Sequence, residues 1–172
     1  MLLWVLLSGW CMSCTTLESG TTGTQTGTSS QTDNTFLLAA ISSGKMEVRA
    51  SEIALEKAAN LEVREFAKLV MRQHTNANGE LTTIANQNRV ALPNTMEAKH
   101  KAVVDQLAKL NTPEFDVAYV QQMEQAHTQD IALYQAVVKS SQSVTLRAFA
   151  LKTIPLLQGH QKLATQLKKI RP

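Results

Sequence analysis

Cysteine is nearly absent from the chain and is confined to its start. Of 172 residues, only Cys11 and Cys14 carry a thiol, so no disulfide supports the rest of the chain. The sequence also has no Gly-rich phosphate loop and no Gly-x-Ser-x-Gly elbow. No familiar motif for thiol, phosphate or acyl-transfer chemistry therefore stands out in the folded part.

Glycine, proline and aromatic residues are also scarce. Few glycines or prolines follow residue 35, and aromatic residues make up only 5% of the chain. The hydrophobic fraction of 44% therefore consists mainly of Ala, Leu, Val and Ile, and Ala and Leu are strong helix formers. A sandwich of short strands would need more frequent turn residues. The composition predicts an all-α protein with long helices.

Charge is low and mixed. The formal net charge is +3, and Lys and Arg alternate with Glu along the chain. A nucleic-acid surface would need its basic residues clustered. We interpret the charges as solvated helix faces and expect no nucleic-acid partner.

Residues 1–14 begin with a short apolar run. The run is too short to cross a bilayer, which takes roughly 20 apolar residues in a helix. We interpret it as a secretory signal, and Ser13-Cys14 resembles the cleavage point of a bacterial lipoprotein. No Lys or Arg precedes the run, and Cys11 stands where a Leu is usual. Plain export and a cytoplasmic chain remain the alternatives.

Residues 15–34 are rich in Thr, Gly, Ser and Gln and contain almost no apolar residue. Such a segment cannot bury enough surface to offset the entropy lost on ordering. We predict a disordered tether between a lipid anchor and a folded domain.

Apolar residues recur every three to four positions in five later segments, which is the spacing of amphipathic helices. The bundle domain is predicted over residues 35–170, with helices at about 35–59, 61–89, 95–110, 112–140 and 143–170. We interpret the third segment as a crossover helix outside the main bundle. The predicted fold is a ferritin-like four-helix bundle of two antiparallel hairpins with a short crossover helix.

One conspicuous polar residue interrupts the apolar stripe of each long helix near its middle. These residues are Glu47, His74, His127 and His160. Four helices side by side would bring them to the same level inside the bundle. Buried charged groups pair with one another or bind a metal, because burying them alone is costly. One carboxylate and three imidazoles suit Zn, Fe, Mn, Cu or Ni, so the pattern predicts a metal site of unknown identity.

Neighbouring residues could orient the imidazoles. Asp130 lies one turn after His127, and Gln73 lies next to His74, so both are candidates for this role. His100 stands between two lysines in the crossover segment, and we expect it to be exposed. A buried Glu–His hydrogen-bond cluster without metal is the alternative reading of the four residues.

A di-iron site is disfavoured. Glu124 stands three residues before His127 and forms the Glu-x-x-His pair of ferritin-like di-iron bundles. The other two histidines have Met71 and Leu157 at that position, so the required glutamates are missing. The pattern favours a single metal ion.

The same segments carry a resemblance to a known family. They run from Phe36 to Val48 with Glu47, from Phe66-Ala67 through Met71 to His74-Thr75, Leu92-Pro93, Phe115-Asp116 with Tyr119, Met123 and His127, and Phe149-Ala150 with Pro155 to His160. The chain resembles the bacterial family known as domain of unknown function 4142 over about residues 34–168. The resemblance implies a ferritin-like bundle, export and no settled activity. The family usually has Asp before the histidine of the second helix, where this chain has Gln73.

We therefore interpret the chain as an exported helical bundle in the periplasm or outer membrane. Its expected partners are a transition-metal ion and, through the lipid anchor, a membrane. A metal-free envelope protein that binds partners is the alternative, and a ferritin-like redox enzyme is a third reading. The sequence leaves open whether the protein is an enzyme.

Overall fold

The structure is a computed structural model, and it describes residues 31–112 and 114–169. The all-α prediction is confirmed, since the described part forms five helices. They are α1 (Gln31–Lys57), α2 (Leu61–Gln87), α3 (Ala98–Lys109), α4 (Glu114–Ser140) and α5 (Val144–Leu167). The segment 1–14, expected as a signal, lies outside the described residues, as does most of the expected tether.

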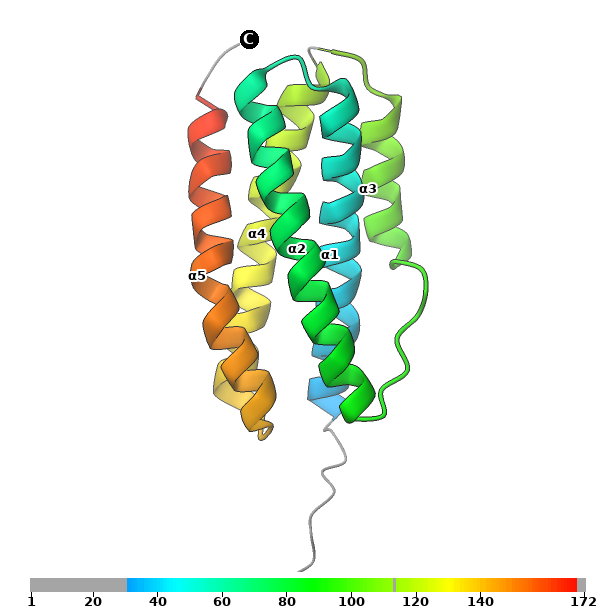
Figure 1. Cartoon of the computed structure of the whole chain (residues 1–172), viewed down its shortest axis with the longest axis vertical. Coiled ribbons are helices and arrows are strands. Elements are labelled where there is room, and N and C mark those ends of the chain that lie inside the picture. The colour runs from blue at the N-terminus through cyan, green and yellow to red at the C-terminus, as the bar shows by residue number, and fades with distance from the viewer. Residues whose placement is uncertain (1–30, 113, 170–172) are drawn as a thin grey trace, which may run out of the picture.

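Four long helices stand side by side, and the short α3 packs against the outer side of α1 (Figure 1). The chain forms two close hairpins, α1 with α2 and α4 with α5. Between them, residues 88–97 return along the bundle to α3, so α4 runs in the same direction as α2 (Figure 1). This connection places all four long helices around one interior.

The first helix begins four residues earlier than predicted. Residues 31–34 were expected to belong to the tether, yet they form the first turn of α1. Asp33 in this turn suits the positive end of the helix. Phe36 and Leu37 are fully buried directly after it, and their burial anchors a turn that composition alone places in a disordered segment.

The start of α2 is fixed by two side chains. Asn60 Oδ1 accepts hydrogen bonds from the backbone N–H groups of Glu62 (2.7 Å) and Val63 (3.3 Å), as an N-cap residue does. The backbone N–H of Asn60 donates to Asp116 Oδ2 at 2.8 Å. The first turn of α4 therefore holds the α1–α2 corner in place.

The core consists of two apolar clusters, one at each end of the bundle. Large side chains of the first are Phe66, Phe115, Tyr119 and Met123. Large side chains of the second are Phe36, Leu37, Leu81, Tyr134 and Phe149. Polar residues from all four long helices occupy the level between the clusters, which is the level of the candidate site.

His100 is not exposed as expected. It is half-buried, and the Ser42 hydroxyl lies 2.7 Å from its Nδ1 atom. The same hydroxyl accepts the backbone N–H of Glu97 at 2.7 Å, at the start of α3. The flanking lysines suggested a solvent-facing side chain, but Ser42 is 58 positions away in the chain and sequence spacing does not reveal the contact.

Within residues 31–112 and 114–169, no helix combines the length and the apolar character of a membrane-crossing segment.

Replacing Asn60 with Ala should destabilise the protein by about 1 kcal/mol, the usual effect of losing an N-cap side chain. Chemical denaturation followed by circular dichroism measures the change. Asn76→Ala is the matched control, because Asn76 is exposed in the middle of α2 and Ala is the better helix former. Equal stability of the wild type and Asn60→Ala would show that this cap does not stabilise the corner.

Candidate metal centre

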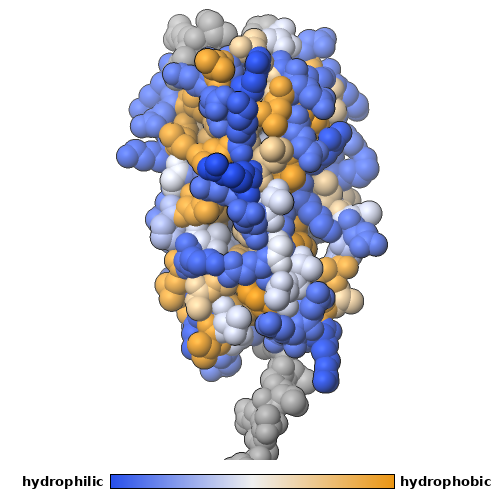
Figure 2. All heavy atoms as spheres, viewed as in Figure 1, coloured by the Kyte–Doolittle hydropathy of each residue, from blue (hydrophilic) through white to orange (hydrophobic). Residues whose placement is uncertain are grey.

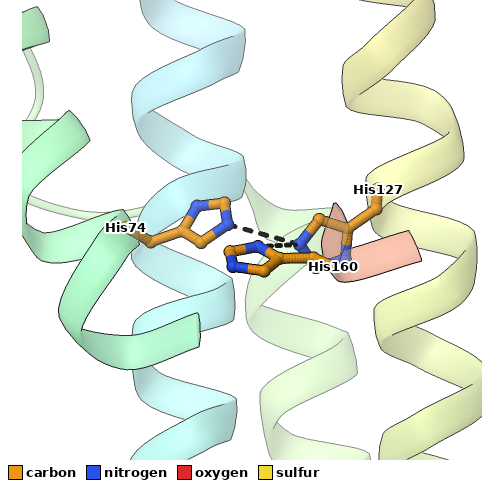
Figure 3. A group of neighbouring side chains, drawn as sticks. All are labelled: His74, His127 and His160. Carbon is orange, nitrogen blue, oxygen red and sulfur yellow. Dashed lines mark hydrogen bonds between the residues drawn. The ribbon is translucent and has the colours of Figure 1, made fainter. Parts of the chain in front are cut away.

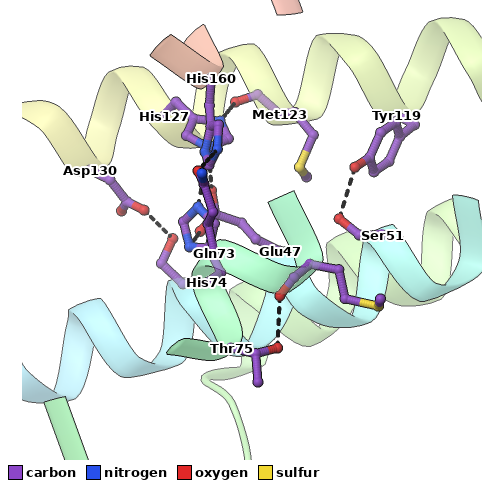
Figure 4. A network of polar contacts seen from close by, with 12 residues as sticks. Glu47, Ser51, Gln73, His74, Thr75, Tyr119, Met123, His127, Asp130 and His160 are labelled. Carbon is purple, nitrogen blue, oxygen red and sulfur yellow. Dashed lines mark hydrogen bonds and ion pairs between the residues drawn. The ribbon is translucent and has the colours of Figure 1, made fainter. Parts of the chain in front are cut away.

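The structure brings all four sequence-predicted residues together inside the bundle. Glu47 comes from α1, His74 from α2, His127 from α4 and His160 from α5 (Figures 3 and 4). Their exposed fractions are 0%, 5%, 0% and 2%. One ring nitrogen from each histidine lies within 4.8 Å of the other two. Each long helix therefore contributes one side chain to a single buried group, which is called the pocket below.

His127 Nε2 lies at the centre of the group. It is 3.0 Å from His160 Nδ1, 3.3 Å from His74 Nε2 and 3.4 Å from Glu47 Oε1. The other Glu47 oxygen, Oε2, lies 2.9 Å from His74 Nδ1. Nitrogen ligands at 2.0–2.1 Å from a tetrahedral zinc ion are separated by about 3.3 Å. The distances from His127 Nε2 to the other two ring nitrogens therefore match the spacing of ligands around one metal ion.

Two of the imidazoles have one ring N–H committed outside the pocket. His127 Nδ1–H donates to the carbonyl oxygen of Met123 at 2.6 Å, and that oxygen can only accept. His160 Nε2–H donates to the side-chain oxygen of Gln73 at 2.6 Å. A neutral imidazole carries a single N–H. His127 Nε2 and His160 Nδ1 therefore face each other with their lone pairs.

Two lone pairs 3.0 Å apart repel each other unless a cation lies between or beside them. If the proton of His74 is on Nδ1, next to the Glu47 carboxylate, then His74 Nε2 carries a lone pair. This lone pair faces the same point as those of His127 Nε2 and His160 Nδ1. Outer ring nitrogens that face a carbonyl, an amide and a carboxylate are the usual support for metal-binding imidazoles. The ring nitrogens that face one another therefore suit a metal, and so do the partners of the opposite ring nitrogens.

Glu47 is the second unusual feature of the pocket. It is fully buried, and neither of its oxygens accepts a well-aligned hydrogen bond from a fixed donor among the described residues. Burial raises its pKa to about 7, although the neighbouring His127 and a hydrogen bond with Asp130 act in the opposite direction. A buried carboxylate without a well-aligned donor is costly, and a bound cation would reduce this cost.

Asp130 has a different role from the one predicted. We expected it to orient His127, but it accepts a hydrogen bond from the Ser43 hydroxyl at 3.0 Å. Burial and the nearby charge of Glu47 raise the pKa of Asp130 well above its usual value. Asp130 and Glu47 therefore form a pair of buried acidic groups beside the imidazoles.

Gln73 orients an imidazole, but not the neighbouring one. The sequence suggested a contact with His74, whereas the observed hydrogen bond goes to His160 of α5. Adjacent residues on a helix point about 100° apart, so Gln73 faces the next helix while His74 faces the pocket. The Met123 carbonyl was missed, although its position four residues before His127 fits a contact along one helix face.

Glu124 lies outside the pocket. Its carboxylate bonds Lys168 and the Thr165 hydroxyl on the surface between α4 and α5. The Glu-x-x-His pair of α4 therefore does not place both of its side chains in one site. This geometry agrees with the preference for a single metal over a di-iron centre.

The sequence of the chain matches a known protein family. The family described as "Domain of unknown function (DUF4142)" matches residues 18–167. The chain belongs to this family. No curated protein matches the DUF4142 chain.

Solved structures similar to this DUF4142 protein are helical. A DUF305 fragment from Deinococcus radiodurans aligns with a TM-score of 0.74 at 11% identity, covering 84% of this chain and all of that chain. CopM in its Cu(II)-bound form aligns with a TM-score of 0.68 at 19% identity, covering 80% and 95%. A DUF305 protein from Streptomyces coelicolor, described as secreted, aligns with a TM-score of 0.69 at 16% identity, covering 79% and 89%. At these identities the likeness shows a shared fold.

Burial keeps the pocket histidines of the DUF4142 protein neutral at pH 7. It lowers the pKa of His74 to about 4. It lowers the pKa of His160 to about 3, and the neighbouring His127 and His74 add to the effect. Burial also lowers the pKa of His127, while the Glu47 charge acts in the opposite direction. Neutral imidazoles are the form that binds metals.

These pKa shifts predict that the metal-free protein is sensitive to acid. Below pH 6.5 the unfolded chain takes up protons that the three buried histidines refuse, and this lowers stability as the pH falls from 6.5 toward 4. Proton uptake by Glu47 and Asp130, whose pKa values are raised in the folded protein, offsets part of this loss. The His160→Gln variant lacks one of the imidazoles that take up a proton in the unfolded chain. The free energy of unfolding, measured in EDTA, should therefore fall less steeply with acid, by about 1.4 kcal/mol per pH unit. Identical slopes for the wild type and His160→Gln would show that His160 is not held neutral.

Proposed function

We propose that this DUF4142 protein binds a single transition-metal ion through His74, His127 and His160, with the Glu47 carboxylate beside them. The observation that carries the proposal is the pair of inner ring nitrogens of His127 and His160, which lie 3.0 Å apart while their protons are committed to Met123 and Gln73. A cation satisfies both nitrogens and the Glu47 carboxylate at once.

The donor set favours copper or zinc. Three imidazole nitrogens and one carboxylate oxygen suit Zn²⁺ in a tetrahedral site, and imidazoles also suit Cu(II). Glu47 and Asp130 can together supply the negative charge that balances a divalent ion in a buried pocket. The structural relative CopM was solved with Cu(II), which supports testing copper first. When bound, the metal would supply Lewis acidity or, as copper, one-electron redox chemistry.

The proposal extends to architecture and location. We assign the bundle to the ferritin-like type, because a long connection after the first hairpin makes α2 and α4 parallel (Figure 1). We also propose export to the periplasm or outer membrane, with lipidation at Cys14 as one form of anchoring. The N-terminal composition supports export, and one structural relative is described as secreted.

A metal-free role is the second candidate, favoured by the raised pKa of Glu47. A protonated Glu47 can donate to His74 Nδ1, and His74 Nε2–H can then donate to His127 Nε2. Such a chain would suit a structural envelope protein. It leaves His160 Nδ1 without a donor, however, and for that reason we prefer the metal.

Changing His127 to Ala should abolish high-affinity binding of Cu²⁺ or Zn²⁺, because His127 Nε2 lies at the centre of the donor group. Isothermal titration of metal-stripped protein measures binding, and circular dichroism checks folding. His160→Gln serves as a second variant with less loss of volume. His100→Ala is the matched control, since His100 contacts Ser42 outside the pocket. Unchanged affinity in both pocket variants would contradict the assignment.

The two glutamates near the pocket should behave differently. Glu47→Gln should weaken metal binding at least 10- to 100-fold, because even the loss of an outer residue that only supports metal ligands has an effect of that size. Glu124→Gln should leave affinity and the number of bound ions unchanged, because Glu124 bonds Lys168 on the surface. Two ions per chain in the wild type, reduced to one in Glu124→Gln, would instead favour a dinuclear site.

A further inference from the structure

The four seams of the bundle are not equally closed. The hairpin partners, α1 with α2 and α4 with α5, pack closely, whereas α2 and α5 make fewer contacts along their length. A groove of about 530 Å³ opens between the first half of α2 and the last half of α5. Leu61, Leu69, Leu163 and Leu167 form much of its wall. Figure 2 shows this face, where hydrophobic surface lies among polar side chains over the upper part of the two helices.

The groove adjoins the histidine pocket. Phe66 lines the groove and is itself buried, and its ring meets that of His160 edge-on with 6.2 Å between centroids. Gln73 follows Leu69 by one turn on the same face of α2, and its side chain bonds His160. The groove therefore leads toward one ligand of the proposed site, with Phe66 and Gln73 between them.

The remaining exposure of the pocket lies on the same side. His74 of α2 and His160 of α5 retain 5% and 2% exposure, whereas Glu47 of α1 and His127 of α4 have none. On the opposite side, Ser43 and Asp130 join α1 to α4 by a buried hydrogen bond, and α3 covers the outside of α1. The residual exposure of the four side chains therefore belongs to residues of α2 and α5.

We propose that the metal ion enters and leaves the pocket through the seam between α2 and α5, and that the Gln73–His160 hydrogen bond closes this route. The proposal rests on the metal-binding function proposed above. The charged side chains in the groove lining, Glu62 and Glu65, are both acidic and suit an approaching cation, although Glu65 also pairs with Lys68. When the Gln73 contact breaks, the His160 ring is free to turn toward the groove.

The first test measures uptake and release rates separately. Cu²⁺ uptake is followed by stopped-flow absorption and release by transfer to EDTA, in full-length protein with Cys11→Ser and Cys14→Ser. Gln73→Ala should speed both rates about five- to tenfold, while the equilibrium affinity changes less than threefold. The size follows from the loss of one neutral hydrogen bond. Gln158→Ala, an exposed glutamine of α5, is the matched control and should match the parent.

The outcomes separate the two proposals. Absence of Cu²⁺ binding by the parent protein would overturn the metal-binding function itself. Binding by the parent with an unchanged uptake rate in Gln73→Ala would overturn only the closing role. Faster release with unchanged uptake would show that Gln73 merely orients His160, because an orienting residue stabilises the bound state without blocking the way in.

A second test closes the seam covalently. Glu80 and Lys152 form an ion pair between α2 and α5, on the other side of the histidines from the groove. In the Cys11→Ser/Cys14→Ser background, cysteines at these two positions can be bridged by a short bis-maleimide, which keeps the two helices from separating. The bridged Glu80→Cys/Lys152→Cys protein should take up Cu²⁺ at least tenfold more slowly than its unbridged form. The matched bridge, Glu124→Cys/Lys168→Cys, joins α4 to α5 and should leave uptake unchanged. The proposed route would be overturned if both bridges slowed uptake equally, or if neither bridge slowed it.

Discussion

This structure depends on two imidazole nitrogens, one from His127 and one from His160, that face each other without a proton between them. Each ring already donates its single N–H to a partner on its other side. Met123 and Gln73 accept the outer N–H groups of His127 and His160, which leaves two inner lone pairs 3.0 Å apart in an enclosed pocket. Glu47 adds a buried carboxylate that has no well-aligned donor within the described part of the chain. Inside a protein such groups are stable only when a proton or a metal ion joins them. The fold is arranged around this requirement.

The rest of the bundle supports the polar level from both sides. One apolar cluster lies at each end of the four long helices, and the polar layer lies between them. Asn60 and Asp116 fix the corner from which α2 descends, so His74 is held at the depth of Glu47. Because the four ligand candidates come from four helices, a shift of any one helix along its axis would separate them.

The sequence predicts the helices and the four pocket residues because both depend on periodicity. Apolar positions that recur every three to four residues identify the buried face of each helix, and a polar residue on that face must enter the core. Long helices of similar length that lie side by side then bring their midpoints to one level. Glu47, His74, His127 and His160 follow from this reasoning alone.

Partners across the bundle could not be predicted in the same way. Gln73 contacts His160 and not the adjacent His74, and Ser42 reaches His100 over 58 positions. Periodicity gives the face and the depth of a side chain, but it does not say which neighbouring helix that face meets. The sequence predicts the start of α1 at about residue 35, whereas the helix begins at Gln31, for a related reason. Composition marks residues 31–34 as polar, whereas their helical state depends on the burial of Phe36 and Leu37 directly after them.

Family membership gives this chain a fold and an unknown function, and the structural relatives are too distant in sequence to add an activity. The metal assignment therefore rests on this chain's own residues. X-ray absorption spectroscopy of the wild-type protein loaded with one equivalent of Cu²⁺ or Zn²⁺ tests it most directly. The account predicts three imidazole nitrogens at about 2.0 Å, with their outer-ring scattering, and one oxygen neighbour. A first shell of oxygen or sulfur atoms without imidazole scattering would contradict it.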